Sequence, residues 1–215
     1  MRNNLGWMAV GALVLAGANV QAADLQVAGS IVPGSCSLNI PTLTVDYGRI
    51  SVNDLSPDSY TSLGKLNTPF NITCDGPTLV GLTAVDNRVA SKKHIVMTVV
   101  DPMLALPVNC YGLGTNADGA KIGAFSMHVR NYSVDGNTNF ETVLKIQNSW
   151  LRANDTVRND LTPLTWRAVG TYDPHLLTTV TGELEVEAVI NDTTELVVRE
   201  DLQIDGSATL VMNYI

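Results

Sequence analysis

Three cysteines are the residues of this chain best suited to covalent chemistry: Cys36, Cys74 and Cys110. Side chains alternate between the two faces of a strand, so Cys36 shares a face with Leu38, and Cys74 shares a face with Ile72. Both thiols are therefore expected to point inward from strand-like segments, as a bridge between neighbouring strands requires. Cys110 lies in a loop-like segment with no base near it in the sequence. This pattern favours a Cys36–Cys74 disulfide and predicts an idle or buried thiol at Cys110 rather than a catalytic one.

A glycine motif offers a second chemistry, the binding of a dinucleotide. Residues 112–117 (GLGTNA) fit G-x-G-x-x-A, and Asp135 follows about 20 residues later. That function requires a buried strand before the motif and a helix after it. Here residues 107–110 (PVNC) precede the motif and an Asp118–Gly119 pair follows it. The context predicts a turn, and no cofactor is expected.

Metal and hydrolase chemistry have equally little support in the sequence. Asn116, Asp118 and Asp135 do not have the spacing of a calcium-binding EF-hand loop. The three histidines are scattered, and His128 falls on the polar face of its strand. Neither G-x-S-x-G nor H-E-x-x-H occurs. We therefore expect no catalytic residue and no metal ligand, and a protein that is not an enzyme.

The elements that must position the cysteines are predicted to be strands. Residues 183–188 (ELEVEA) alternate strictly between glutamate and apolar side chains, and residues 125–130, 70–74 and 95–99 alternate in the same way. A helical pattern is hard to find, and the best candidate, residues 140–150, is a weak one. Frequent turn signals such as Asp-Gly separate the segments. Many short strands with such turns indicate an all-β, two-sheet sandwich in a single domain, residues 23–215.

The first residues carry the features of an export signal. Arg2 is followed by an uncharged, mostly apolar run at residues 5–18, and Val20 and Ala22 are the small residues expected before a cleavage site. Residues 1–22 are thus predicted to be a signal peptide, cleaved between Ala22 and Ala23. The alternative, an uncleaved membrane anchor, is disfavoured because a span needs roughly 20 apolar residues. We expect a periplasmic protein with no membrane insertion after cleavage, and cysteines that meet an oxidising compartment.

The charge of the chain excludes two classes of partner. The formal net charge is −8, and removal of the signal peptide with Arg2 makes it −9. Nucleic acids and anionic membrane surfaces attract proteins mainly through lysine and arginine. A chain with this acidic excess is therefore not expected to bind either of them.

Both ends of the predicted domain resemble the chaperone–usher family of fimbrial subunits. Residues 29–38 (GSIVPGSCSL) are similar to the family's opening strand, and the second cysteine in residues 72–75 (ITCD) follows at a similar spacing. The chain ends, as those subunits do, in an alternating strand with a penultimate tyrosine, residues 208–215 (ATLVMNYI). Residues 23–40 and 111–125 look like a poorly characterised fimbrial-like branch, which includes a periplasmic protein named for the glutamate synthase operon.

The resemblance implies an incomplete immunoglobulin-like Greek-key sandwich that lacks its final strand. In that family a periplasmic chaperone first lends a strand, and the N-terminal extension of a neighbouring subunit then replaces it. The implied partners are a periplasmic chaperone, an usher and other fimbrial subunits, and the implied locations are the periplasm or a cell-surface fimbrium. The residues implied to border the groove for the donated strand are Ala208, Leu210, Val211, Met212, Tyr214 and Ile215.

Two features depart from the family's pattern. Only residues 23–28 precede the opening strand, with Leu25 and Val27 as weak donor anchors, whereas a donor strand needs about 8–10 residues. Leu202 stands where such subunits often carry a glycine. These departures suggest a minor or tip-like subunit, or a fimbrial-like protein that does not polymerise. The alternative function is a complete periplasmic sandwich that binds a ligand or regulates nitrogen or glutamate metabolism.

Overall fold

The computed structural model describes residues 26–29, 34–41, 44–93 and 106–215. Gly34–Ile215 form one compact unit, and the preceding residues belong to a separate one. The predicted signal peptide, its cleavage site at Ala22 and Ala23, Leu25 and the predicted strand at residues 95–99 lie outside the described residues. Val27 is described, lies outside any strand and is exposed. Within the described residues no helix is long and apolar enough to cross a membrane.

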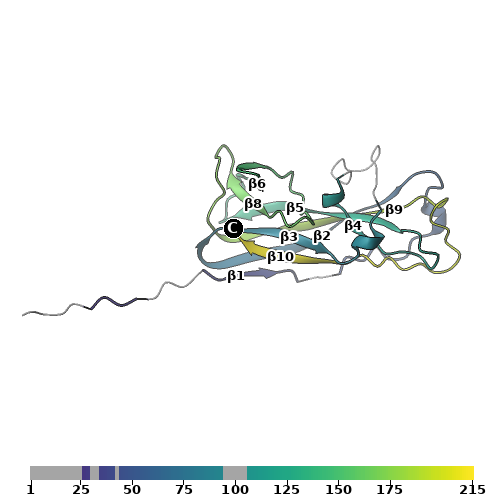
Figure 1. The fold of residues 1–215 in the computed structure, drawn as a ribbon, viewed down its shortest axis with the longest axis horizontal. Coiled ribbons are helices and arrows are strands. Elements are labelled where there is room, and N and C mark those ends of the chain that lie inside the picture. The colour runs from purple at the N-terminus through teal and green to yellow at the C-terminus, as the bar shows by residue number, and fades with distance from the viewer. Residues whose placement is uncertain (1–25, 30–33, 42–43, 94–105) are drawn as a thin grey trace, which may run out of the picture. The chain divides into compact units, whose positions relative to one another are not determined.

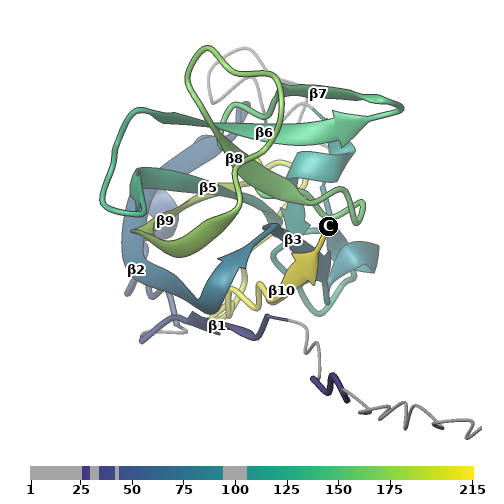
Figure 2. The same ribbon diagram turned by 90° about the vertical axis from the view of Figure 1, so that its left-hand side faces the viewer.

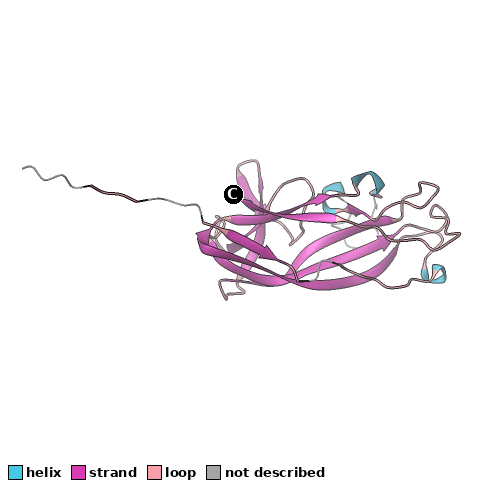
Figure 3. Ribbon diagram, turned by 90° about the horizontal axis from the view of Figure 1, so that it is seen from below, coloured by secondary structure: helices cyan, strands magenta, loops and turns pink. Residues whose placement is uncertain are grey.

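Strands dominate the described part of the compact unit, and its helical elements are short 3-10 turns (Figure 3). The weak helical candidate at residues 140–150 is instead a hairpin of two strands. The 3-10 turns are η1 (Val52–Asp54), η2 (Val89–Ser91) and η4 (Pro107–Asn109). The strands are β1 (Cys36–Asn39), β2 (Thr61–Thr78), β3 (Val80–Asp86), β4 (Tyr111–Gly112), β5 (Gly123–Val134), β6 (Phe140–Ile146), β7 (Ser149–Arg152), β8 (Leu164–Ala168), β9 (Leu177–Ile190) and β10 (Ala208–Tyr214).

Two antiparallel sheets pack face to face, which confirms the predicted all-β sandwich (Figures 1 and 2). Sheet A has the strand order β1-β2-β9-β5-β4, and sheet B has the order β10-β3-β8-β6-β7. Consecutive strands β2 and β3 belong to different sheets, as do β9 and β10. This exchange of the chain between sheets is consistent with the immunoglobulin-like arrangement.

The core follows from the alternation of side chains that the sequence shows. In β9, Leu184, Val186 and Ala188 face inward and are buried. Met127 in the neighbouring strand β5 and Trp166 in β8 lie in the same core, and Trp166 is completely buried. The predicted inward faces of β9 and β5 are therefore confirmed.

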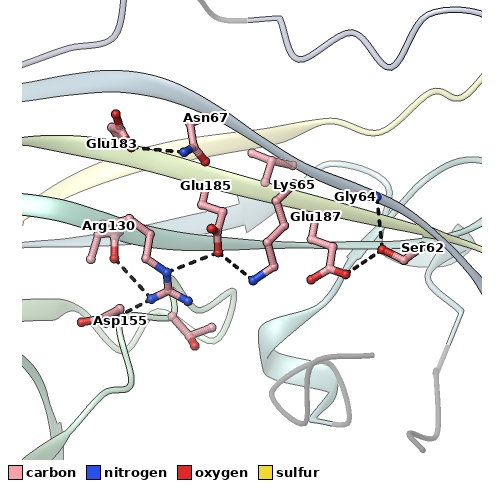
Figure 4. A network of polar contacts seen from close by, with 12 residues as sticks. Ser62, Gly64, Lys65, Asn67, Arg130, Asp155, Glu183, Glu185 and Glu187 are labelled. Carbon is pink, nitrogen blue, oxygen red and sulfur yellow. Dashed lines mark hydrogen bonds and ion pairs between the residues drawn. The ribbon is translucent and has the colours of Figure 1, made fainter. Parts of the chain in front are cut away.

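The glutamates of β9 face outward and are held by side chains of the two neighbouring strands (Figure 4). Glu185 pairs with Lys65 of β2 at 3.1 Å and with Arg130 of β5 at 3.3 Å. Glu187 accepts a hydrogen bond from Ser62 at 2.7 Å. This face ties the three central strands of sheet A together through their side chains as well as their backbones.

His128 lies on this outer face of β5 as predicted, yet it is buried. One contribution to its burial comes from the chain between β7 and β8, which lies alongside β5. Val129 donates its N–H to the carbonyl of Asp155, and Val157 donates to that of Met127. The polar face of β5 is therefore not a solvent face along its whole length.

The glycine motif is a turn, as its context predicts. Gly112 ends β4, and Gly114 has a φ of +94°. Gly119 then donates its N–H to the carbonyl of Asn116, which reverses the chain before β5. No helix follows the motif, so it does not have the structure that binds a dinucleotide.

Candidate functional site: a groove between two edge strands

Each sheet ends in an edge strand on the same side of the sandwich. β1 is the edge of sheet A and β10 is the edge of sheet B, and both views place them side by side (Figures 1 and 2). The backbone N–H of Cys36 donates a hydrogen bond of 2.9 Å to the hydroxyl of Tyr214. This bond joins the start of β1 to the end of β10 and closes one end of the space between them.

A groove extends from this closed end between two antiparallel walls. The first wall consists of residues 36–41 and 44–50, and the second wall consists of residues 198–214. Leu38 faces the same cavity as Leu210, and further along Tyr47 faces the same cavity as Leu202. The walls therefore run from Cys36 and Tyr214 at the closed end towards Ile50 and Val198 at the far end.

The predicted disulfide is present and fixes the start of the first wall. Cys36 and Cys74 lie directly opposite each other in the pairing of β1 with β2, and their sulfur atoms are bonded. β1 has only four residues. The covalent link therefore adds to the few backbone hydrogen bonds that hold this short edge strand.

The second wall exposes a strand edge with no partner among the described residues. Asn87 donates its N–H to the carbonyl of Ser207, and Ile215 donates to that of Leu79. Because bonding alternates along an antiparallel ladder, the odd-numbered residues of β10 pair with β3. The N–H and C=O groups of the even-numbered residues consequently point away from β3, towards the groove. These residues are Ala208, Leu210, Met212 and Tyr214.

The part of the second wall that precedes β10 is held by an arginine. Arg88 binds Asp205 in a bidentate ion pair, with N–O distances of 2.8 Å and 3.0 Å. This pair lowers the pKa of the Asp205 carboxyl below its usual value. Asp205 also donates its N–H to the carbonyl of Leu113. These contacts place the extended segment against the loop that follows β4.

The part of the first wall that follows β1, residues 44–50, is attached to the sandwich by Tyr47. Residues 44–50 lie outside any strand and have no backbone–backbone hydrogen bond within the described residues. The Tyr47 hydroxyl donates to the carbonyl of Val186 at 2.8 Å and accepts from the N–H of Ala188 at 3.1 Å. Burial is the main cause that raises the pKa of Tyr47. The phenol thus replaces a strand neighbour for this part of β9.

A bulge in β2 makes room for this hydroxyl. The pairing of β2 with β9 shifts between Ser62 and Lys65, and Gly64 between them has a φ of +83°. A side chain other than glycine is strained in this left-handed region. The shift leaves Ala188 without a partner in β2, so its N–H is available to Tyr47, whereas Val186 stays paired with Leu66.

The groove is a two-part cavity floored by the core of the sandwich. The part next to β10 has a volume of about 800 Å³, and the part beyond Tyr47 has a volume of about 470 Å³. Both parts are bordered by Val45, Tyr47 and Ile204, so the cavity is continuous along the walls. The floor of the first part comprises Leu113, Phe125, Met127, Leu184, Val186 and Ala188.

The structure brings together some of the groove residues that the sequence pointed to. Ala208 and Leu210 line the cavity, and Met212 packs against the core just beyond it. Tyr214 does not line the cavity but closes its end. Val211 is half-buried on the opposite face of β10, as expected.

Ile215 and Val27 complete the comparison with the sequence expectations. The side chain of Ile215 lies near Gly81 of β3, where a methyl group added to the glycine would be 2.8 Å from it. It therefore lies on the outer side of sheet B, as expected for an odd-numbered residue in a strand whose even-numbered residues face inward. Val27, a weak donor anchor, lies in the separate N-terminal unit.

Sequence reasoning predicted the strand at Cys36 but missed the rest of the first wall, residues 44–50. The alternation of half-buried Val45 and Tyr47 with exposed Asp46 and Gly48 is the period of a strand and could have indicated it. The hydrogen bonds from Tyr47 to β9 could not have been found in this way, because they join residues about 140 positions apart.

The remaining cysteine is buried, in agreement with the sequence. Cys110 is 1% exposed and its sulfur lies 3.5 Å from the carbonyl oxygen of Leu106. Burial raises the pKa of its thiol to about 11. A thiol that stays protonated at neutral pH is a poor nucleophile.

Comparison with known proteins places these features in an evolutionary context. The chain is 27% identical to Protein GltF of Escherichia coli (strain K12) over 235 residues, covering 89% of this chain and 88% of GltF. It is also 26% identical to Uncharacterized protein YhcF of the same organism over 109 residues, covering 46% of each chain. No solved structure matches the chain at a significant level. Residues 25–126 match the family described as "Protein of unknown function (DUF1120)", and the chain is thus a homologue of GltF and YhcF.

Proposed function

We propose that this protein is a fimbrial or fimbrial-like structural subunit, exported to the periplasm, that is completed by an extended strand from another protein. The donors would be a periplasmic chaperone and then a neighbouring subunit, with an usher directing the exchange. The observation that carries the proposal is the open groove between β1 and β10, where core residues of both sheets meet an unpaired strand edge.

The physical need for a donated strand follows from what the groove leaves accessible. Met127 and Val186 pack in the core and also line the cavity. An apolar floor beside an unpaired strand edge is a site at which chains aggregate unless something covers it. A partner that binds only the folded protein stabilises it by mass action.

The geometry also suits a strand better than a small molecule. An extended peptide placed along β10 would accept and donate backbone hydrogen bonds at Ala208, Leu210 and Met212, and its alternate side chains would enter the apolar floor. Backbone pairing of this kind supplies affinity, and the pockets supply specificity.

The position of the protein in an assembly is a finer part of the proposal. If the signal peptide is cleaved after Ala22, six residues, 23–28, precede Gly29. Six extended residues reach at most about 20 Å. Such an extension is too short to fill a groove of this kind, so we propose a minor or tip-like subunit that accepts a strand.

The proposal is tested by giving the protein its own donor strand. An Asn-Gly turn and about ten residues of alternating valine and threonine, appended after Ile215, would fold back along β10 as a hairpin. The expected result is a higher yield from the periplasm and a higher melting temperature than those of the wild type. The matched control carries the same residues in a shuffled order without alternation and is expected to give no gain.

Expression of the wild type alone is the second part of the test. We expect it to aggregate or to be degraded unless a chaperone is supplied. A soluble, monomeric wild type with a cooperative melt that the appended strand leaves unchanged would contradict the proposal. That outcome would favour the alternative, a self-sufficient periplasmic binding or regulatory protein.

A further inference from the structure

The two parts of the groove differ in their charge. Among the described residues, no charged one lines the part next to β10, and we call this part the apolar lobe. The part beyond Tyr47, which we call the acidic lobe, is bordered by Asp46, Glu200 and Asp201, with Arg49 as its basic residue. A single occupant that follows the groove would meet apolar side chains first and carboxylates afterwards.

The carboxylates of the acidic lobe are available to a partner. Asp46, Glu200 and Asp201 are all exposed. In the described part of the chain none of the three takes part in an ion pair, although carboxylates elsewhere, such as Asp205 and Glu185, do. Asp46 accepts a hydrogen bond of 2.8 Å from the N–H of Gly48, which positions its carboxylate within the first wall.

The acidic lobe lies at the end of the groove that is opposite the closed end. Tyr214 and Cys36 close the opposite end, and the walls run antiparallel from there. The charge therefore gives the groove a direction: its closed end and its middle are uncharged, and its far end is negative.

We infer that the strand accepted by this groove carries alternating apolar residues along the apolar lobe and basic residues where it reaches Glu200 and Asp201. Charge complementarity of this kind selects among strands of similar hydrophobicity and fixes their register. The net charge of −8 adds a long-range attraction for a cationic partner. This inference rests on the proposed function, because it names the chemistry of the donated strand.

The test uses the full chain with a longer appended strand. After the Asn-Gly turn, about fourteen alternating residues would extend from Tyr214 back to the level of Asp201, since each added residue advances the strand by about 3.3 Å. Three versions differ only in their last two outward-facing residues, which are lysine, glutamine or glutamate. A fourth version carries the lysines next to the turn, at the closed end of the groove.

We expect the version with terminal lysines to be the most stable and the version with terminal glutamates to be the least stable. Exposed ion pairs are individually weak, so the unfolding equilibrium constant should be about 2- to 10-fold lower with terminal lysines than with terminal glutamates in low salt. The difference should disappear in about 1 M salt, where the screening length is roughly 3 Å. Lysines next to the turn should give no advantage over glutamine.

Variants of the protein separate the acidic lobe from the overall charge. Glu200→Gln combined with Asp201→Asn should abolish the preference for lysine, whereas Asp173→Asn, in the exposed loop between β8 and β9, should preserve it. Equal stability of the lysine and glutamate versions would overturn the inference while leaving the proposed function intact, provided that the glutamine version is more stable than the wild type. If no appended strand stabilises the protein, the proposed function itself is wrong.

Discussion

Replacement of Tyr47 by phenylalanine tests how the first wall of the groove is held. The substitution keeps the ring and removes only the hydroxyl, which bonds the backbone of Val186 and Ala188. Ala188 is 1% exposed, so its N–H would lose its partner in a buried position. Val186, which stays paired with Leu66 of β2, would lose the bond that Tyr47 donates to its carbonyl.

The cost can be worked out from these two groups. A buried polar group left without a partner costs about 1–3 kcal/mol. Tyr47 borders an open cavity from which water can reach part of the site, so the lower end of the range applies to the Ala188 N–H, and the lost hydrogen bond to the Val186 carbonyl adds about 1 kcal/mol. The expected loss is about 2 kcal/mol of unfolding free energy, which corresponds to a drop in melting temperature of about 4–8 °C for a chain of this size.

The assay is urea-induced unfolding followed by tryptophan fluorescence, since Trp166 is completely buried. The matched control is Tyr172→Phe, because Tyr172 is 88% exposed and its hydroxyl has no comparable role. The control should change stability by no more than about 0.5 kcal/mol. If Tyr47→Phe unfolds at the same urea concentration as the control, the attachment of the first wall through β9 is refuted.

Three further predictions concern other parts of the molecule. Replacement of both Cys36 and Cys74 by serine should lower the unfolding free energy by about 4 kcal/mol in the chain-entropy description. Urea-induced unfolding measures this loss, and a loss below about 1 kcal/mol would contradict the prediction. Burial opposes ionisation of Asp135, but the hydrogen bonds to its carboxylate outweigh burial and lower its pKa below 3.8. The ionised carboxylate therefore stabilises the folded protein fully at neutral pH, and this contribution is lost as the pH falls through the lowered pKa. The stability difference between wild type and Asp135→Asn should therefore shrink in acid, and a difference that grows there would oppose this reasoning. Cys110 should resist thiol reagents at pH 8 in the folded protein and react after unfolding, because its pKa is about 11 and it is buried; rapid labelling of the native state would contradict its burial.

The sequence predicted those features that depend on local patterns. The period of two in residues 183–188 and 125–130 identified the inward faces of β9 and β5 correctly. The same reasoning at Cys36 and Cys74 identified the disulfide, because both cysteines follow the apolar face of their strands. Alternation also identified β10 as a strand with Ala208 and its even-numbered neighbours facing inward.

Features that depend on distant parts of the chain could not be predicted. The bond between Cys36 and Tyr214 joins residues 178 positions apart, and the ion pair of Arg88 with Asp205 joins residues 117 apart. The burial of His128 depends on a segment that pairs with β5 outside any regular strand. Such contacts follow from the way the sheets are assembled, which no local pattern specifies.

The central claim is that β10 has a free edge that another strand can occupy. Backbone amide hydrogen exchange, followed residue by residue by NMR, tests it most directly. In the wild type the amides of Thr209, Val211 and Asn213, which face β3, should be protected, while those of Leu210 and Met212 exchange rapidly. An appended complementary strand should slow the exchange of Leu210 and Met212, whereas equal protection of all five amides in the wild type would show that the edge is already filled and contradict the account.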